Sequence, residues 1–160
     1  MGQVMARHMP QVMKSLGADR LDRTFASNGE RIYYTATSRS GRPVTARIGL
    51  VTMTGPMMSC VDCHGPEGQG GPIRYCIECH GEESQMATLQ APPLTYYGDE
   101  VMKQAITEGI GPEGRPLFTP MPRWSMSEED LSDLLAYLRS ILENSRPKNP
   151  PLKPGSITAP

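Results

Sequence analysis

The chain has 160 residues, which is enough for one domain with extended arms. Sixteen basic and 17 acidic side chains give a formal net charge of −1, which argues against a nucleic-acid-binding protein because such proteins carry a basic excess. The longest apolar-leaning stretch, residues 48–61, is shorter than the about 20 residues that a membrane span needs. With 16 Gly, 16 Pro and only 38% hydrophobic residues, we expect long loops and a modest core.

The N-terminal arm, residues 1–24, contains His8 and several methionines at four-residue spacing, namely Met1, Met5, Met9 and Met13. Thioethers beside an imidazole suit Cu(I), so a copper-binding face is one interpretation. We favour the interpretation that these methionines pack against the edge of an apolar group. Pro10 is expected to start a helix rather than to continue one.

The next segments predict a helix and then a hairpin. Ser27 and Glu30 form a capping-box pattern that predicts a helix, although Tyr33, Tyr34 and Thr35 would also suit a strand. Residues 44–51 then alternate between apolar and polar side chains, which predicts a short β-hairpin arm before the first cysteine.

All four cysteines fall in two matched motifs, Cys60-Val61-Asp62-Cys63-His64 and Cys76-Ile77-Glu78-Cys79-His80. C-x-x-C-H is the attachment sequence for c-type haem. The two thiols add across the vinyl groups of the ring, and the adjacent histidine can ligate the iron. We therefore predict two covalently attached haem c groups, bound through Cys60, Cys63 and His64 and through Cys76, Cys79 and His80.

Other chemistries explain these cysteines less well. A disulfide pair would not account for the matched histidines, and a thioredoxin-like redox motif would need a βαβ context that the sequence does not show. The serious rival is zinc, because C-x2-C-x12-C-x2-C is close to the spacing of a four-cysteine ribbon. A zinc-stabilised interaction module would leave both trailing histidines unexplained.

Two further helices are predicted after the motifs. Asp99 can cap a helix that ends at Gly109. Ser127 can cap a last helix, whose apolar stripe is expected to face the core. That stripe consists of Leu131, Leu134, Leu135, Leu138 and Ile141.

Met121 is a candidate axial ligand. Pro120 and Pro122 flank it, and we expect them to hold it in a stiff, extended loop. A thioether is a common sixth ligand in electron-carrying haem proteins, where it raises the potential.

The chain resembles the class I c-type cytochromes over about residues 27–34 and 60–142. The residues that carry the resemblance lie in the segments 27–33, 60–71, 91–94, 121–124 and 126–131. The resemblance implies that a glycine and an aromatic residue of the first helix cross the last helix. It also implies that Met121 serves the haem of Cys60, Cys63 and His64. The chain departs from the family by about 25 residues between the first helix and Cys60, and by its second haem motif.

Two six-coordinate haems need four axial ligands, of which His64, His80 and Met121 supply three. His8, from its own chain or a neighbouring one, is the principal candidate for the fourth. Met57, Met58 and Met86 are alternatives. Because glycines at positions 65, 68, 70 and 71 favour a compact turn between the motifs, we expect the two haems to lie close enough for rapid electron exchange.

We therefore expect a mainly α fold: a class I cytochrome c-like helical domain with long loops, over residues 25–145. A short β-hairpin arm and extended N- and C-terminal arms complete it. The tail, residues 146–160, has five prolines and is read as an extended strap or linker.

The expected function is electron transfer by a dihaem c-type cytochrome, with redox proteins as partners and no enzymatic activity. Haem attachment outside the cytoplasm predicts an exported protein, periplasmic or extracellular, whose signal peptide has been removed. If His8 is supplied in trans, the protein could form a homo-oligomer or filament with a continuous chain of haems. A haem enzyme or gas sensor is the alternative, and would need an open iron site.

Overall fold

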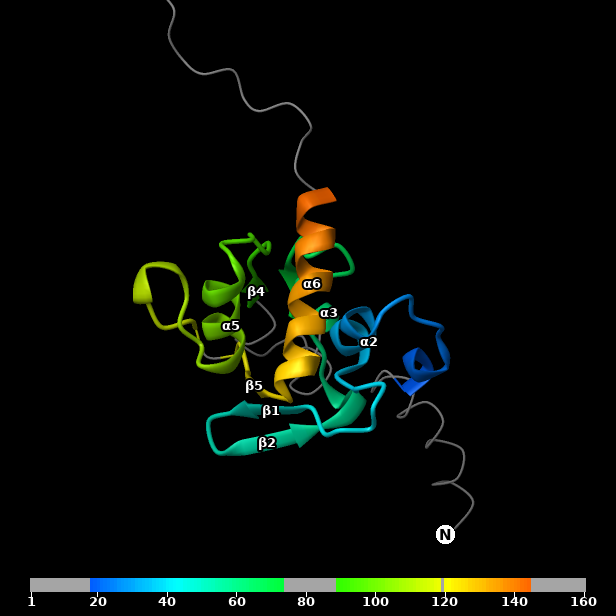
Figure 1. Ribbon diagram of the computed structural model, residues 1–160. Helices are drawn as coiled ribbons and strands as arrows, with labels where there is room; N and C mark the ends of the chain where they lie inside the picture. The colour runs from blue at the N-terminus through cyan, green and yellow to red at the C-terminus, as the bar shows by residue number, and fades with distance from the viewer. Residues whose placement is uncertain (1–17, 74–88, 119, 145–160) are drawn as a thin grey trace, which may run out of the picture.

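The computed structural model describes residues 18–73, 89–118 and 120–144. Its α-helices within these ranges are α2 (Asn28–Thr35), α3 (Cys60–His64), α5 (Asp99–Thr107) and α6 (Glu128–Asn144). In Figure 1, α6 runs through the middle of the molecule, with α2 on one side and α5 on the other. No helix of the described residues is long and apolar enough to cross a membrane.

The smaller elements are short turns of 3-10 helix and two small sheets. The 3-10 helices are η1 (Ala18–Asp22), η2 (Gly55–Met57) and η4 (Pro112–Gly114). One antiparallel sheet has the order β2-β1-β5, formed by β2 (Val51–Thr54), β1 (Thr45–Ile48) and β5 (Arg123–Ser125). The other pairs β3 (Gly71–Pro72) with β4 (Gln90–Ala91).

The fold is therefore more mixed than the mainly helical domain that the sequence predicts. The predicted hairpin arm is confirmed by the pairing of β1 with β2, whose register places Thr45 opposite Thr54. The sequence did not predict the third strand, β5, which pairs with β1 and connects the hairpin to the segment after Met121.

The predicted caps of α2 and α6 are confirmed. Ser27 Oγ accepts a hydrogen bond from the Glu30 amide at 3.0 Å, so residues 33–35 are helical and do not form a strand. At α6, Ser127 Oγ accepts from the Asp130 amide at 3.2 Å. Each hydroxyl satisfies one of the amides that the first turn of a helix leaves without a partner.

The predicted cap of α5 is wrong. Gly98 occupies the N-cap position and Asp99 is the first helical residue. The Asp99 carboxylate instead accepts hydrogen bonds from the Tyr96 hydroxyl, at 2.5 Å, and from Arg139 of α6. The carboxylate therefore contacts Tyr96 and the neighbouring helix α6 and does not cap α5. The helix ends close to the predicted position, with Gly109 at φ +70° just beyond it.

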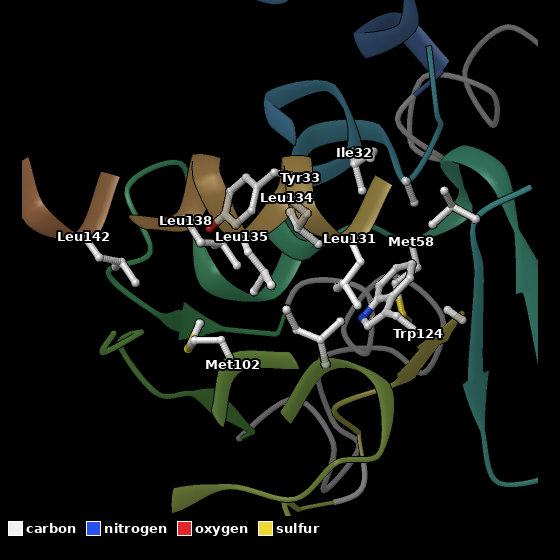
Figure 2. Packing of buried hydrophobic residues seen from close by; sticks show 14 residues of the cluster. Ile32, Tyr33, Met58, Met102, Trp124, Leu131, Leu134, Leu135, Leu138 and Leu142 are labelled. Atoms are coloured by element: carbon white, nitrogen blue, oxygen red, sulfur yellow. The ribbon is translucent and has the colours of Figure 1, made fainter. Parts of the chain in front are cut away.

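The apolar stripe of α6 forms the centre of the core, as predicted. Its leucines at positions 131, 134, 135 and 138 are buried and Ile141 is partly buried. Leu142, which the prediction did not include, is buried as well. Figure 2 shows these leucines extending from one side of α6 toward Met102 of α5 and Trp124 of β5. Ile32 and Tyr33 of α2 belong to the same cluster, so all the longer helices share one core.

Helices α2 and α6 cross in close contact at Gly29, as the family resemblance implies. A Cβ atom at Gly29 would overlap the backbone carbonyl of Asp133 and would also press on Tyr137. Only glycine allows the two backbones to approach this closely.

A buried carboxylate connects the same two helices. The Asp130 side chain is fully buried, and its oxygens accept hydrogen bonds from Ser38 at 2.6 Å, Ser127 at 2.7 Å and Asn28 at 2.9 Å. Burial acts to raise the pKa of Asp130, but these hydrogen bonds and the nearby charge of Arg42 outweigh it and leave that pKa lowered.

We expect Asp130→Asn to lower the free energy of unfolding by about 1–3 kcal/mol at pH 7, because hydrogen bonds to a charged group are lost. The contribution of the carboxylate is present above its unfolded-state pKa, about 3.9, and is lost as pH falls through the lower folded-state pKa. Urea unfolding at a series of pH values should therefore show the difference between wild type and variant shrinking in acid.

The control for this prediction is Glu129→Gln, one residue earlier on α6, where the side chain is 71% exposed. It should change the free energy of unfolding by less than about 0.5 kcal/mol. Equal effects of the two substitutions at pH 7 would contradict the assignment.

Candidate functional site

A cavity of about 440 Å³ borders the core and opens to the surface, where the exposed side chains of Tyr97 and Phe118 line it. Its volume is within the range of about 300–1,000 Å³ that ligand pockets span. His64 and Met121, which are far apart in the sequence, both line it, and so does Cys60. The rest of the wall is mostly apolar and comes from all the longer helices and the loops between them. These residues include Tyr33, Leu94, Val101, Met102, Ala105, Ile106, Leu117, Trp124 and Leu138.

The first C-x-x-C-H motif forms the short helix α3, which presents Cys60 and His64 to the cavity. The Asp62 carboxylate accepts hydrogen bonds from the Ser59 amide at 2.9 Å and the Ser59 hydroxyl at 2.7 Å, which fixes the start of the helix. Cys63, one turn after Cys60, packs beside the second apolar cluster, formed by Ile73, Leu89 and Ala91.

The 3-10 helix η1 contacts the first turn of α3 through Arg20. Arg20 makes an ion pair with Asp62 at 2.6 Å and donates a hydrogen bond to the Ser59 hydroxyl at 3.1 Å. This contact could not be predicted from the sequence, because the residues lie about 40 positions apart and belong to no shared motif.

The His64 imidazole is buried and has a defined proton position. Its Nδ1 lies 3.2 Å from the carbonyl oxygen of Pro92. Because a carbonyl can only accept, Nδ1 carries the proton and Nε2 keeps its lone pair. Burial lowers the pKa of His64, although the bond to Pro92 opposes that effect, so the ring is neutral at pH 7. A neutral imidazole oriented in this way is the form that binds a metal.

A glycine-rich turn follows His64, as the sequence predicts. The Gly70 amide donates to the His64 carbonyl at 2.8 Å, and the Leu94 amide donates to the Gly68 carbonyl at 2.7 Å. Gly70 has a φ of +75°, and a Cβ there would overlap the Ala91 carbonyl. The turn therefore lies directly against the segment 91–94, whose Pro92 carbonyl orients His64.

Met121 lies in a bend and not in the extended loop that the flanking prolines predict. Its amide donates to the Phe118 carbonyl at 3.1 Å, which closes a turn before it. After it, Trp124 pairs with Ala46 in the sheet, so the segment is anchored to β1. The partly buried Met121 side chain packs against the core cluster and lines the cavity.

The Cys60 thiol is in its neutral form at physiological pH. Burial raises its pKa to about 12, and the nearby Cys63 and Asp62 add to the effect. A nucleophilic cysteine needs a lowered pKa, so this environment disfavours thiolate catalysis.

Several predicted residues lie outside the described part of the chain: His8, Cys76, Cys79, His80 and Met86, with the methionines of the N-terminal arm and the tail, residues 146–160. Met58, an alternative ligand, is buried in the core cluster beside Trp124. Within the described residues, no group of three or more His, Cys, Asp or Glu side chains could hold a metal ion.

A family model described as cytochrome c matches residues 56–142, more than half of the chain. The chain therefore belongs to the cytochrome c family, whose members carry covalently bound haem c and transfer electrons. No significant match was found among curated proteins or among solved structures. The apolar cavity, with a neutral imidazole and a thioether among its lining residues, is chemically suited to a haem.

Tyr33 supports this cavity through its hydroxyl group. The side chain is fully buried, and its hydroxyl donates to the Gly65 carbonyl, immediately after His64, at 2.6 Å. We expect Tyr33→Phe to lower the free energy of unfolding by about 1–2 kcal/mol, because that carbonyl loses its donor. Chemical denaturation of purified protein measures the change.

The matched control is Tyr34→Phe on the same helix. The Tyr34 hydroxyl is exposed, and its hydrogen bond to the Pro66 carbonyl is long, at 3.5 Å. Removing this hydroxyl should therefore lower the free energy of unfolding by less than about 0.5 kcal/mol. If the two substitutions destabilise the protein equally, the Tyr33 hydrogen bond is not what holds the turn.

Proposed function

We propose that the chain is an electron-transfer cytochrome whose first haem is linked to Cys60 and Cys63, with His64 and Met121 as axial ligands. The observation that carries this proposal is that one apolar cavity is lined by Cys60, by the oriented imidazole of His64 and by Met121. The haem supplies the one-electron redox chemistry, and the chain supplies its surroundings.

The residues around the cavity suit that role in three ways. The hydrogen bond to Pro92 keeps Nε2 of His64 available as a ligand. The side chains that α5 and α6 contribute to the wall are apolar and would surround much of a bound haem, and the neutral thioether of Met121 is a ligand that raises the reduction potential.

We propose a second haem on Cys76, Cys79 and His80, close to the first. The ends of this motif's segment are held together, because the Ile73 amide donates to the Leu89 carbonyl at 3.1 Å. Ile73 and Leu89 pack beside Cys63. Cys76 follows Ile73 by three residues, so the two α-carbons are at most about 11 Å apart. This bound favours two attachment points near each other, as the proposed two-haem relay requires.

The number and location of the haems can be measured by intact mass under denaturing conditions. We expect the wild-type chain to carry the mass of two haems, and Cys60→Ala/Cys63→Ala and Cys76→Ala/Cys79→Ala each to carry one. A single haem in the wild type would leave only one functional motif. The bare chain mass would contradict haem attachment and favour a zinc or disulfide protein.

Met121 can be tested as a ligand by Met121→Leu, with Met126→Leu as the control because Met126 is a partly buried core residue outside the cavity wall. We expect Met121→Leu to lower the reduction potential of one haem and to let the reduced protein bind carbon monoxide. Wild type and Met126→Leu should not bind it at that haem. Carbon monoxide binding by the wild type there would favour the haem enzyme or gas sensor.

For the sixth ligand of the second haem, we propose His8, from the same chain or from a neighbouring copy. If His8 comes from the same chain, we expect His8→Ala to lower the paramagnetic resonance signal of the bis-histidine haem without changing the molecular mass in solution. If His8 comes from a neighbouring copy, His8→Ala should also dissociate a haem-connected polymer. Electron paramagnetic resonance and light scattering on the same sample measure both effects. A spectrum that contains only His/Met haems in the wild type would rule out His8.

We further propose that the protein acts in the periplasm or outside the cell, because haem c is attached outside the cytoplasm. Two haems would add about four propionate charges to the formal net charge of −1 and bring it to about −5. Redox partners with basic docking surfaces would suit such a protein.

A further inference from the structure

The side chain of Arg123 turns back from the sheet toward Met121. Arg123 is the first residue of β5, opposite Arg47 in the register with β1. Its Nη1 donates to the Met121 carbonyl at 2.7 Å, and its Nη2 donates to the Leu117 carbonyl at 3.3 Å. One guanidinium group therefore joins two points of the loop that lines the cavity.

The end of α5 leaves room for this guanidinium only because residue 109 is glycine. A Cβ atom at Gly109 would overlap the guanidinium carbon and nitrogens of Arg123. The Gly109 carbonyl also accepts a hydrogen bond from the Leu117 amide at 2.7 Å. The Arg123 side chain thus packs on the backbone at the end of α5 while it holds the segment from Leu117 to Met121.

The partners of Arg123 are backbone carbonyls, whereas Arg115 in the same loop pairs with Glu113 in an exposed ion pair. Across the described residues, no carboxylate forms an ion pair with Arg123. A charged donor strengthens each hydrogen bond. A lysine cannot reproduce the planar fork that reaches both carbonyls.

We propose that Arg123 is a positioning residue for Met121: its guanidinium holds the Met121 carbonyl and so keeps the thioether directed into the cavity. This inference rests on the proposed function, in which Met121 is an axial ligand. Without the guanidinium, the loop from Leu117 to Met121 opens more often, and each opening withdraws the sulfur and leaves the iron accessible to other ligands.

The pairing of β5 with β1 allows this role to be separated from folding. The backbone of Arg123 is held in the sheet, and the next residue, Trp124, is buried in the core. A substitution at position 123 therefore leaves the strand anchored and acts on the loop. Arg123→Lys keeps the charge and the aliphatic stem, and so provides a second variant that perturbs the surrounding packing less than Arg123→Gln.

The test is a titration of the oxidised, haem-loaded protein with imidazole, together with reduction potentials and amide hydrogen exchange. We expect Arg123→Gln to raise the affinity for imidazole by about tenfold, since the charged hydrogen bonds are lost. Arg123→Lys should lie between Arg123→Gln and wild type. Exchange of the Leu117 and Met121 amides should become faster in both variants, and the potential of the same haem should fall.

The control is Arg47→Gln, which removes a positive charge from the exposed cross-strand neighbour and should leave the imidazole affinity unchanged. Met121→Leu separates the two proposals. If it raises the affinity and the Arg123 variants do not, the positioning role is wrong and Met121 remains the ligand. If Met121→Leu itself has no effect, the ligand assignment is wrong and the role of Arg123 falls with it.

Discussion

The close crossing of α2 and α6 at Gly29 is the constraint on which the cavity depends. Because a Cβ there would overlap the Asp133 carbonyl, only glycine lets Tyr33 reach its buried position between the helices. From that position Tyr33 lines the cavity and its hydroxyl holds the turn after His64. The Asp130 hydrogen bonds fix the same crossing at the start of α6.

The β-hairpin positions the side of the cavity that Met121 lines. The strands β1 and β2 lie outside the region that the family model matches, residues 56–142, yet β1 pairs with β5 directly after Met121. Figure 1 shows this sheet below the first turn of α6, with β5 leading from the loop into the helix. A segment outside the matched region therefore anchors the part of the family domain that carries Met121.

Features encoded by neighbouring residues could be predicted from the sequence. The caps at Ser27 and Ser127, the stripe of α6 and the hairpin each depend on short-range patterns. Contacts between distant segments could not be predicted, because no periodicity or spacing specifies which backbone carbonyl a side chain will reach. The bonds from His64 to Pro92 and from Arg123 to Met121 are of this kind, and so is the contact of Arg139 with the Asp99 carboxylate, which was predicted to cap α5.

The central claim is that His64 and Met121 hold one haem between them, and proton NMR of the fully reduced protein tests it most directly. A methionine bound to haem iron lies in the ring current of the porphyrin, so its methyl resonance moves far upfield. We predict such a resonance in the wild type and in Met126→Leu, and its loss in Met121→Leu. Absence of an upfield methionine methyl from the wild type, or its persistence in Met121→Leu, would contradict the account.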